Sequence, residues 1–421
     1  MESDLEEYAT EPVPEDKTVG WFKVSMVAAM VAFSLPTFLT GVELAAVSSP
    51  SQSMQIVFWG ALILTVIGSI SAAIGASTRL SSYMLNRIAF GAKGAAVVNI
   101  AFAISLLGWF GVNIDLFSNA VQRLSGDLFD AQAPIWLVEI LAGIVMTVTT
   151  VIGFRAINFL SILLVPVMIV VTVLLIDGAL GVTSFNDLMA QPENTEFNFG
   201  FGVSSIVGAV IVGAIILPDI CRFIRHWQGG VYLVLINYFV IQIIVTGTGA
   251  FSAAAMSDND LLNIMIVLGI GGAAFAIVLA GSWVLNSLNL YSTMLSVEST
   301  FPHLNYRILV AVMGALGTVA AFFNILDYFL DFLFYLSVVF VPVAGVIAVD
   351  YLLLRRSAYH ELTISEKPVR ITAMFAWAIG AGISLLGAEG VITISAIAAV
   401  DAMLISALSY YLLTTISRKL R

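Results

Sequence analysis

The stretch Phe33-Ser-Leu-Pro-Thr-Phe-Leu-Thr-Gly-Val-Glu43 interrupts the first long apolar segment of the chain with a proline and a glycine. Five apolar segments later, the stretch from Val203 to Asp219 carries Gly208, Gly213 and Pro218. Irregular backbone is tolerated inside a bilayer only where it is buried in protein or lines a cavity. Interrupted helices at matching positions of two repeated units are typical of transporters that bind substrate between the repeats. Glycine and proline are also frequent in ordinary membrane helices, so packing without a site remains an alternative interpretation.

About twelve apolar stretches are long enough for a membrane helix, which takes roughly 20 residues. They lie near 21 to 46, 54 to 77, 95 to 120, 133 to 152, 157 to 180, 201 to 221, 229 to 254, 262 to 295, 306 to 324, 327 to 353, 370 to 388 and 391 to 416. The composition, 60% hydrophobic and 10% charged, agrees with them. The sequence therefore predicts an all-α integral membrane protein.

The basic residues indicate its orientation. If the N-terminus is cytoplasmic, all of the 17 lysines and arginines except Arg123 fall in segments on the inner side. Such an excess is typical of cytoplasmic loops. We therefore predict a multi-pass protein of the cell inner (cytoplasmic) membrane with both termini cytoplasmic. The net charge of −10 comes from the acidic tail Glu2 to Asp16 and from acidic outer loops, and it does not indicate a nucleic-acid surface.

The interruptions divide the chain into four parts. We predict an acidic cytoplasmic tail at 1–20, a first five-helix repeat at 21–180, a second at 201–353 and two additional helices at 370–416. The connections are short except for Gly181 to Phe199 and Arg356 to Pro368, so no extramembrane domain is expected. The sequence has no glycine-rich phosphate loop followed by lysine and serine or threonine, so accumulation would draw on an ion gradient or on a separate partner.

The third apolar stretch contains Gly108-Trp-Phe-Gly-Val-Asn-Ile-Asp115. Trp109 and Asn113 are four residues apart and share a helix face, so a flat ring can stack on the indole while the amide binds its edge. Tryptophan is also common at membrane interfaces and in cores, which is the competing interpretation. We predict a substrate site here.

The eighth stretch contains Asn286 and Asn289, three residues apart on one face. Two amides there need partners in each other, in a neighbouring helix or in a ligand, and bonding between helices is the competing interpretation. Glu43 follows the first interruption, where a carboxylate can take up a proton or hold a substrate amine. The alternative places Glu43 in water at the outer end of its helix.

Polar residues at the inner helix ends are interpreted as capping and gate contacts: Asp219 with Arg222, and Asp350 with Arg355 and Arg356. The three histidines, His226, His303 and His360, fall in inner loops without metal-ligand spacing. We predict no metal site and no bound cofactor.

Four motifs resemble the cytosine-permease branch of the nucleobase:cation symporter family. They are the run from Ile74 to Gly94, Gly108-Trp-Phe-Gly-Val112, Pro218-Asp-Ile-Cys-Arg-Phe223, and the run from Leu336 to Arg356. They occur in order from the second to the tenth predicted span and cover most of the chain. The resemblance implies a LeuT-like 5+5 inverted-repeat core with two additional C-terminal helices. It also implies transport of nucleobases or related small heterocycles by alternating access.

The resemblance also implies roles for particular residues. Trp109 matches the ring-stacking tryptophan and Asn113 the polar position one turn on. The stretch from Ala209 to Gly213 matches a broken helix that closes the other face of the substrate, and Asn286 matches a polar position in the eighth span.

Two departures from the family pattern concern substrate stacking and ion coupling. Val210 stands where relatives place an aromatic residue, which puts a two-sided aromatic sandwich in doubt. Val284 and Leu285 stand where sodium-dependent members place neighbouring hydroxyls, so a sodium site would lack two oxygen ligands. We therefore favour a proton as the coupling ion, with sodium as the alternative. Glu43 becomes the candidate proton carrier.

We predict a secondary transporter that imports a nucleobase, cytosine or a purine, or a related heterocycle. Its predicted substrate-binding residues are Trp109, Asn113, Gly208, Val210, Gly213, Asn286 and Asn289. The expected partners are the small-molecule substrate and the lipid bilayer, with no obligate protein partner. A transporter-like sensor that binds the same ligands without transport is the alternative. A passive channel would show flux that never saturates, and an enzyme would need a nucleophile and base or a metal cluster that the sequence does not offer.

Overall fold

The computed structural model describes residue 8 and residues 11–129, 134–152, 154–301, 304–362, 368–389, 391–392 and 394–419. Side chains are described for these residues except 124, 127–129, 152, 154–163, 273–280, 299, 306 and 388. His303 and the acidic residues at 2–7 lie outside the described residues. The described regular structure is helical, apart from a single parallel bridge between Val19 and Ile224.

The first predicted repeat folds into seven α-helices, preceded by a short 3-10 turn, η1 (Glu15–Lys17), and followed by the short helix α8. In chain order the helices are α1 (Trp21–Ala32), α2 (Leu35–Val47), α3 (Pro50–Thr78), α4 (Ser82–Phe90), α5 (Ala92–Phe129), α6 (Ile135–Ile152), α7 (Phe154–Val182) and α8 (Phe185–Met189). Of these, α4 lies in a predicted inner connection and α8 in a predicted outer one.

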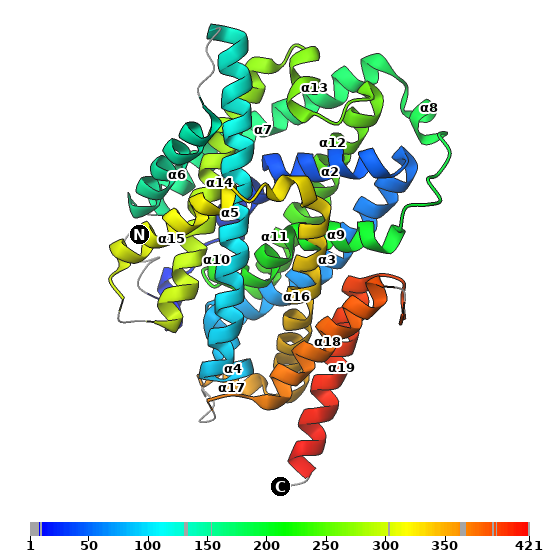
Figure 1. Cartoon of the computed structure of the whole chain (residues 1–421). Helices are drawn as coiled ribbons and strands as arrows, with labels where there is room; N and C mark the ends of the chain where they lie inside the picture. The colour runs from blue at the N-terminus through cyan, green and yellow to red at the C-terminus, as the bar shows by residue number, and fades with distance from the viewer. Residues whose placement is uncertain are drawn as a thin grey trace.

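The second part continues with α9 (Phe199–Ile216), α10 (Pro218–Cys221), α11 (Trp227–Val234), the π-helix η2 (Leu235–Ile241), α12 (Gln242–Met256), α13 (Leu261–Val267), α14 (Gly271–Thr300) and α15 (Tyr306–Ala321). It ends with η3 (Ile325–Tyr328), α16 (Phe329–Val349), the π-helix η4 (Asp350–Leu354), α17 (Arg356–His360), α18 (Ile371–Ala388) and α19 (Ala398–Lys419). In Figure 1, α18 and α19 lie against α16 at one side of the molecule.

The described helices supply about twelve membrane crossings. Seven helical stretches are long and apolar enough to cross a bilayer, and α1 with α2 makes an eighth if the bent pair is one span. Three shorter apolar helices occupy Ile135–Val151, Arg307–Ala321 and Ile371–Gly387. Together with the 30-residue α14, they account for the predicted number.

The interruption of the first span lies at Phe33 and Ser34, where α1 and α2 meet at a bend of 42°. Pro36 stands in the first turn of α2, where a missing N–H costs little. The Thr37 hydroxyl lies 3.0 Å from that of Ser34 and donates to the Val31 carbonyl at 3.2 Å, so side chains satisfy backbone at the break. Gly41 lies inside α2, where an added Cβ would overlap the Thr246 carbonyl of α12.

The sixth span is interrupted at Pro218, which is one of the predicted positions, but not at residues 208–213. The helix α9 runs without a break through residues 208–213, and the change of helix occurs at Leu217, directly before Pro218. A proline disfavours helical geometry in the residue before it, which accounts for this position. Gly208 serves close packing instead, because a Cβ there would overlap the Leu333 carbonyl of α16.

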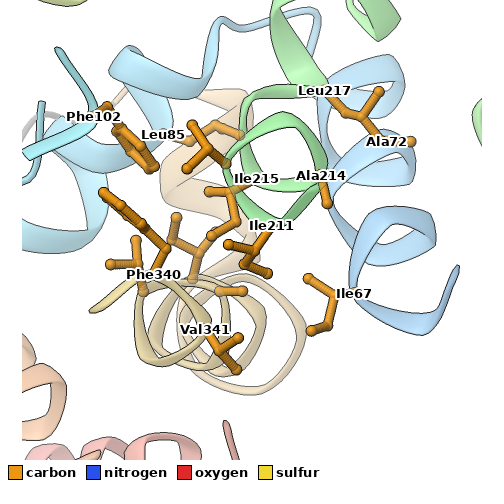
Figure 2. Close-up of a cluster of buried hydrophobic side chains, with 14 of the residues drawn as sticks. Ile67, Ala72, Leu85, Phe102, Ile211, Ala214, Ile215, Leu217, Phe340 and Val341 are labelled. Carbon is orange, nitrogen blue, oxygen red and sulfur yellow. The ribbon is translucent and has the colours of Figure 1, made fainter. Parts of the chain in front are cut away.

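A continuous apolar core joins α3, α4, α5, α9 and α16. Figure 2 shows Ile67 of α3, Ile211 of α9 and Phe340 of α16 meeting in this cluster. The rings of Phe102 and Phe340 stack at a centroid distance of 4.8 Å, with 11° between their planes. Because Phe102 lies on α5, this stacking fixes the helix that carries Trp109.

The segments predicted on the inner side contact one another at one end of the bundle. Residues 11–20, which we call the N-terminal strap, lie across the ends of α3 and α10. The Val13 amide donates to the Arg79 carbonyl at 3.0 Å, and the Val19 amide donates to the Phe223 carbonyl at 2.7 Å. Arg123, the basic residue predicted on the outer side, pairs instead with Asp260. These contacts agree with the predicted grouping of the loops, while the orientation in the membrane stays a prediction.

Candidate substrate site

A cavity of about 100 Å³ lies between the bend of the first span and helices α5, α9 and α14. Apolar residues of α1, α9 and α14 form most of its wall. Its polar lining residues are Ser34, Thr37, Thr40, Trp109, Asp219, Tyr238, Asn289 and Ser292. A largely apolar pocket with a few converging polar groups is the usual form of a small-molecule site. Pockets for drug-sized ligands measure about 300–1,000 Å³, so this cavity is small by comparison.

Trp109 lines the cavity and is fixed by two phenylalanines of α16. The indole makes edge-to-face contacts with Phe329 and Phe332, at centroid distances of 6.0 and 5.4 Å. Only 8% of the residue is exposed. The contacts hold the indole in one orientation, which lowers the entropy cost of stacking a ligand ring on it.

Asn113 lies outside the cavity lining, in contrast to our prediction. Its side-chain amide folds back on α5 and donates to the Trp109 carbonyl at 2.8 Å. The residue is fully buried, and its Oδ1 has no hydrogen-bond partner among the described residues. Sequence spacing placed Asn113 on the face of Trp109, but the short side chain does not extend beyond its own helix.

Asn286 also lies outside the cavity, whereas Asn289 lines it. The Asn286 amide donates to the Phe110 carbonyl of α5 at 2.9 Å and lies 3.2 Å from the Met146 sulfur of α6. It therefore bonds α14 to its neighbours, as the competing interpretation expected. Asn289 stays the amide through which α14 can contact a ligand.

Val210 and Gly213 line the cavity from α9, while Gly208 faces α16. A Cβ on Gly213 would lie 3.3 Å from the Tyr238 hydroxyl, which is ordinary packing with a small adjustment. Since α9 has no broken stretch at 208–213, its backbone N–H and C=O groups are bonded within the helix. From α9, the cavity is therefore lined by glycine and by small or medium apolar side chains rather than by unpaired backbone groups.

Glu43 does not belong to the cavity lining. It lies on α2 beyond Thr40 and is half-buried. The hydroxyls of Ser34, Thr37 and Thr40, spaced three residues apart, instead bring polarity from the first span to the cavity. Sequence reasoning missed them, although hydroxyls repeated at helical spacing beside an interruption were a visible signal.

The positions that we matched to sodium-binding hydroxyls are occupied by buried apolar side chains. Val284 packs in a cluster with Ala29 and Phe33 of the first span, and Leu285 lines the cavity. The face of α14 toward the first span therefore offers hydrocarbon at these two positions. Ser282 and Ser287, the hydroxyls nearest in sequence, are buried and lie outside the cavity lining.

Comparisons with known proteins agree on one family. A family model described as "Permease for cytosine/purines, uracil, thiamine, allantoin" matches residues 12–413. The cytosine permease of Escherichia coli (strain K12) is 29% identical over 412 residues, which are 96% of this chain and 93% of that protein. The hydantoin permease of Microbacterium maritypicum is 23% identical over 416 residues, covering 88% of this chain and 82% of that protein.

The fold matches a solved transporter structure over almost the whole chain. Mhp1, a nucleobase-cation-symport-1 family transporter in a closed conformation with bromovinylhydantoin bound, superposes with a TM-score of 0.82. The two chains are 19% identical, and the match covers 98% of this chain and 96% of that chain. The predicted fold class is therefore confirmed, whereas the boundaries of the two repeats stay a prediction.

Proposed function

This chain belongs to the family of permeases for cytosine and purines, uracil, thiamine and allantoin and is a multi-pass secondary transporter, and we propose that it imports cytosine or a similar single-ring heterocycle. The observation that carries the proposal is the small cavity bordered by Trp109. An indole face binds a flat ring by stacking, and Asn289 offers both a donor and an acceptor to the edge of that ring. Purines, which the family description also names, need room for a second ring.

The relatives support a single ring as the substrate. One of the most similar proteins is a cytosine permease, and another is a hydantoin permease. Both names describe ligands with one flat ring that carries N–H donors and carbonyl acceptors. A cavity of about 100 Å³ agrees with a ring of this size.

We further propose that a proton gradient, rather than a sodium gradient, drives import. Val284 and Leu285 leave the matched positions of α14 without side-chain oxygens, and hard cations such as sodium require several oxygen ligands. The N-terminus and the C-terminus are proposed to be cytoplasmic, because of the distribution of the basic residues.

Uptake into proteoliposomes tests the substrate and the coupling together. Purified protein is reconstituted and supplied with radiolabelled cytosine, adenine, hypoxanthine, uracil or allantoin, under a proton or a sodium gradient imposed separately. We expect saturable cytosine uptake that an inward proton gradient increases and sodium leaves unchanged. Empty liposomes give the background, and Trp109→Ala gives the matched control at the site.

Three outcomes would contradict the proposal. Strict sodium dependence would refute proton coupling. Saturable cytosine binding without any uptake or counterflow would favour a membrane sensor instead. Binding and uptake of purines in preference to cytosine would refute the single-ring assignment.

A further inference from the structure

Asp219 is one of the residues that line the cavity, and nothing in the proposed binding of the ring uses its carboxylate. The residue lies in α10, directly after Pro218, and is 8% exposed. Its Oδ1 accepts hydrogen bonds from the Ser82 amide at 2.8 Å and from the Ser82 hydroxyl at 2.9 Å. Its Oδ2 is buried and has no hydrogen-bond partner among the described residues. One oxygen therefore fixes the carboxylate while the other stays free.

The neighbouring arginine does not bond this free oxygen. Arg222 directs its guanidinium at main-chain carbonyls: Nε donates to Asp219 O at 3.1 Å, and one terminal nitrogen donates to Tyr8 O at 2.5 Å. No ion pair joins the two side chains in the part of the chain that the structure describes. Arg222 therefore leaves Oδ2 as a buried oxygen without a hydrogen-bond partner among the described residues.

The other groups around Asp219 are poor competitors for a proton. Tyr83 on α4 interacts with the Asp219 carboxylate both electrostatically and as a weak side-chain donor, while its ordinary hydrogen bond goes to the Ser292 carbonyl. Cys221, two residues after Asp219, interacts with the carboxylate electrostatically, and Tyr291 on α14 interacts with Tyr83. Burial and the nearby Asp219 charge raise the pKa of Tyr83 well above its usual value, so this phenol stays neutral and donates to the Ser292 carbonyl at 2.8 Å.

The helices α1 and α3 also pack against α10, and both present apolar or small groups at the contact. From α1, Val27 and Ala28 border the cavity. From α3, Gly75 lies against the Pro218 ring. Asp219 is thus a titratable group that the cavity reaches, whereas Glu43 is not part of its wall.

We propose that Asp219, rather than Glu43, takes up and releases the co-transported proton. A proton from water in the cavity binds Oδ2 and forms an O–H bond, and the same bond later breaks when the proton passes to water on the inner side. Closing a cavity around a carboxylate with one unbonded oxygen costs free energy, so the protonated form permits closure. This inference rests on the proposed function, because it requires a proton-driven transporter.

The test compares Asp219→Asn with Glu43→Gln in proteoliposomes. Radiolabelled cytosine is loaded inside to measure exchange and supplied outside to measure proton-driven accumulation. An asparagine Oδ1 can still accept both hydrogen bonds from Ser82, so the contact to α4 survives while the titratable atom is lost. We expect Asp219→Asn to exchange cytosine across the membrane but to lose at least about tenfold of its proton-driven accumulation. Glu43→Gln is expected to accumulate cytosine as the unmodified protein does.

Several results would overturn the inference. Normal accumulation by Asp219→Asn would do so, as would loss of accumulation confined to Glu43→Gln. Sodium-driven uptake by the unmodified protein would also refute it. If the unmodified protein takes up no member of the ligand panel, the proposed function itself fails, and this result is distinct because it does not depend on any variant.

A second variant keeps the inference testable if Asp219→Asn does not fold. Ser82→Ala removes the hydroxyl donor to Oδ1 and leaves the titratable group in place. A carboxylate that loses a hydrogen bond holds its proton more strongly, so the pH of half-maximal uptake is expected to shift upward. An unchanged pH profile in folded Ser82→Ala protein, judged by its melting temperature, would refute the assignment of Asp219.

Discussion

Gly208 and Gly213 lie five residues apart on α9, and alanine at each position is expected to have opposite consequences. A Cβ on Gly208 would overlap the Leu333 carbonyl oxygen and lie 2.5 Å from its carbonyl carbon. Ordinary carbon separations are about 3.5–4.0 Å, so the α9 and α16 backbones would have to part by about 1 Å. Overpacking typically lowers the free energy of unfolding by 1–3 kcal/mol. Because the neighbouring atoms at Gly208 belong to backbone, we expect a loss of about 3 kcal/mol for Gly208→Ala. The better helix propensity of alanine returns about 1 kcal/mol of that.

Alanine at Gly213 meets only the Tyr238 hydroxyl at 3.3 Å and a Val210 methyl at 3.7 Å, both of which are ends of side chains. Its cost in stability is therefore expected to stay below about 1 kcal/mol. The added methyl enters the cavity, however, and one methyl in a binding pocket is worth about 1–3 kcal/mol, or roughly 10- to 200-fold in affinity.

The assay measures melting temperature and cytosine Kd for both purified variants. Gly208→Ala is expected to lower the melting temperature by several degrees with Kd nearly unchanged, and Gly213→Ala to raise Kd at a nearly unchanged melting temperature. A Gly208→Ala protein of normal stability and weakened cytosine binding would refute the assignment of Gly208 to packing. It would restore the prediction that Gly208 belongs to the substrate site.

Three further predictions follow from other contacts. Trp109→Ala is expected to raise the cytosine Kd about 5- to 150-fold, because stacking of a base on an aromatic ring is worth roughly 1–3 kcal/mol; Trp109→Phe keeps a flat ring, and equal losses in both variants would argue against stacking. Asp350→Asn is expected to destabilise the protein by about 3 kcal/mol, since the buried carboxylate accepts hydrogen bonds from Arg355, Tyr359 and Tyr410. Asp331→Asn, at an exposed position, serves as the control. Equal melting temperatures of the two variants would contradict the stabilising role of the Asp350 contacts. Removal of residues 1–14, which takes away the Val13 contact of the strap, is expected to speed maleimide labelling of Cys221, the single cysteine. The increase is on the order of tenfold, because about one net hydrogen bond is lost. An unchanged rate would show that residues 1–14 do not restrict access to Cys221.

The number of spans and the position of Trp109 followed from the sequence because both depend on local properties. The spans depend only on the length and hydropathy of each segment. A large aromatic side chain in the middle of a span can lie only against a neighbouring helix, the lipid or a cavity. The first break was predicted within a few residues because Pro36 limits the backbone directly.

The side-chain partners were less accessible to sequence reasoning. A glycine permits either an irregular backbone or close packing, and only the Leu333 carbonyl decides between these for Gly208. The amides of Asn113 and Asn286 bond carbonyls of α5, so their orientation depends on tertiary neighbours rather than on spacing. Asp219 was visible in its motif, but its free oxygen became apparent only when Ser82 and Arg222 were placed around it.

The glycines at helix crossings also determine which parts of the protein can move separately. The α2 backbone touches that of α12 at Gly41, and the α9 backbone touches that of α16 at Gly208. At these crossings no layer of side chains separates the two backbones, so each helix pair is expected to move as one rigid unit. Relative movement of the helices is then concentrated at two positions: the bend at Phe33 and Ser34, and the turn at Leu217. Both positions border the cavity, so a small rotation of either helix pair changes the shape of the cavity.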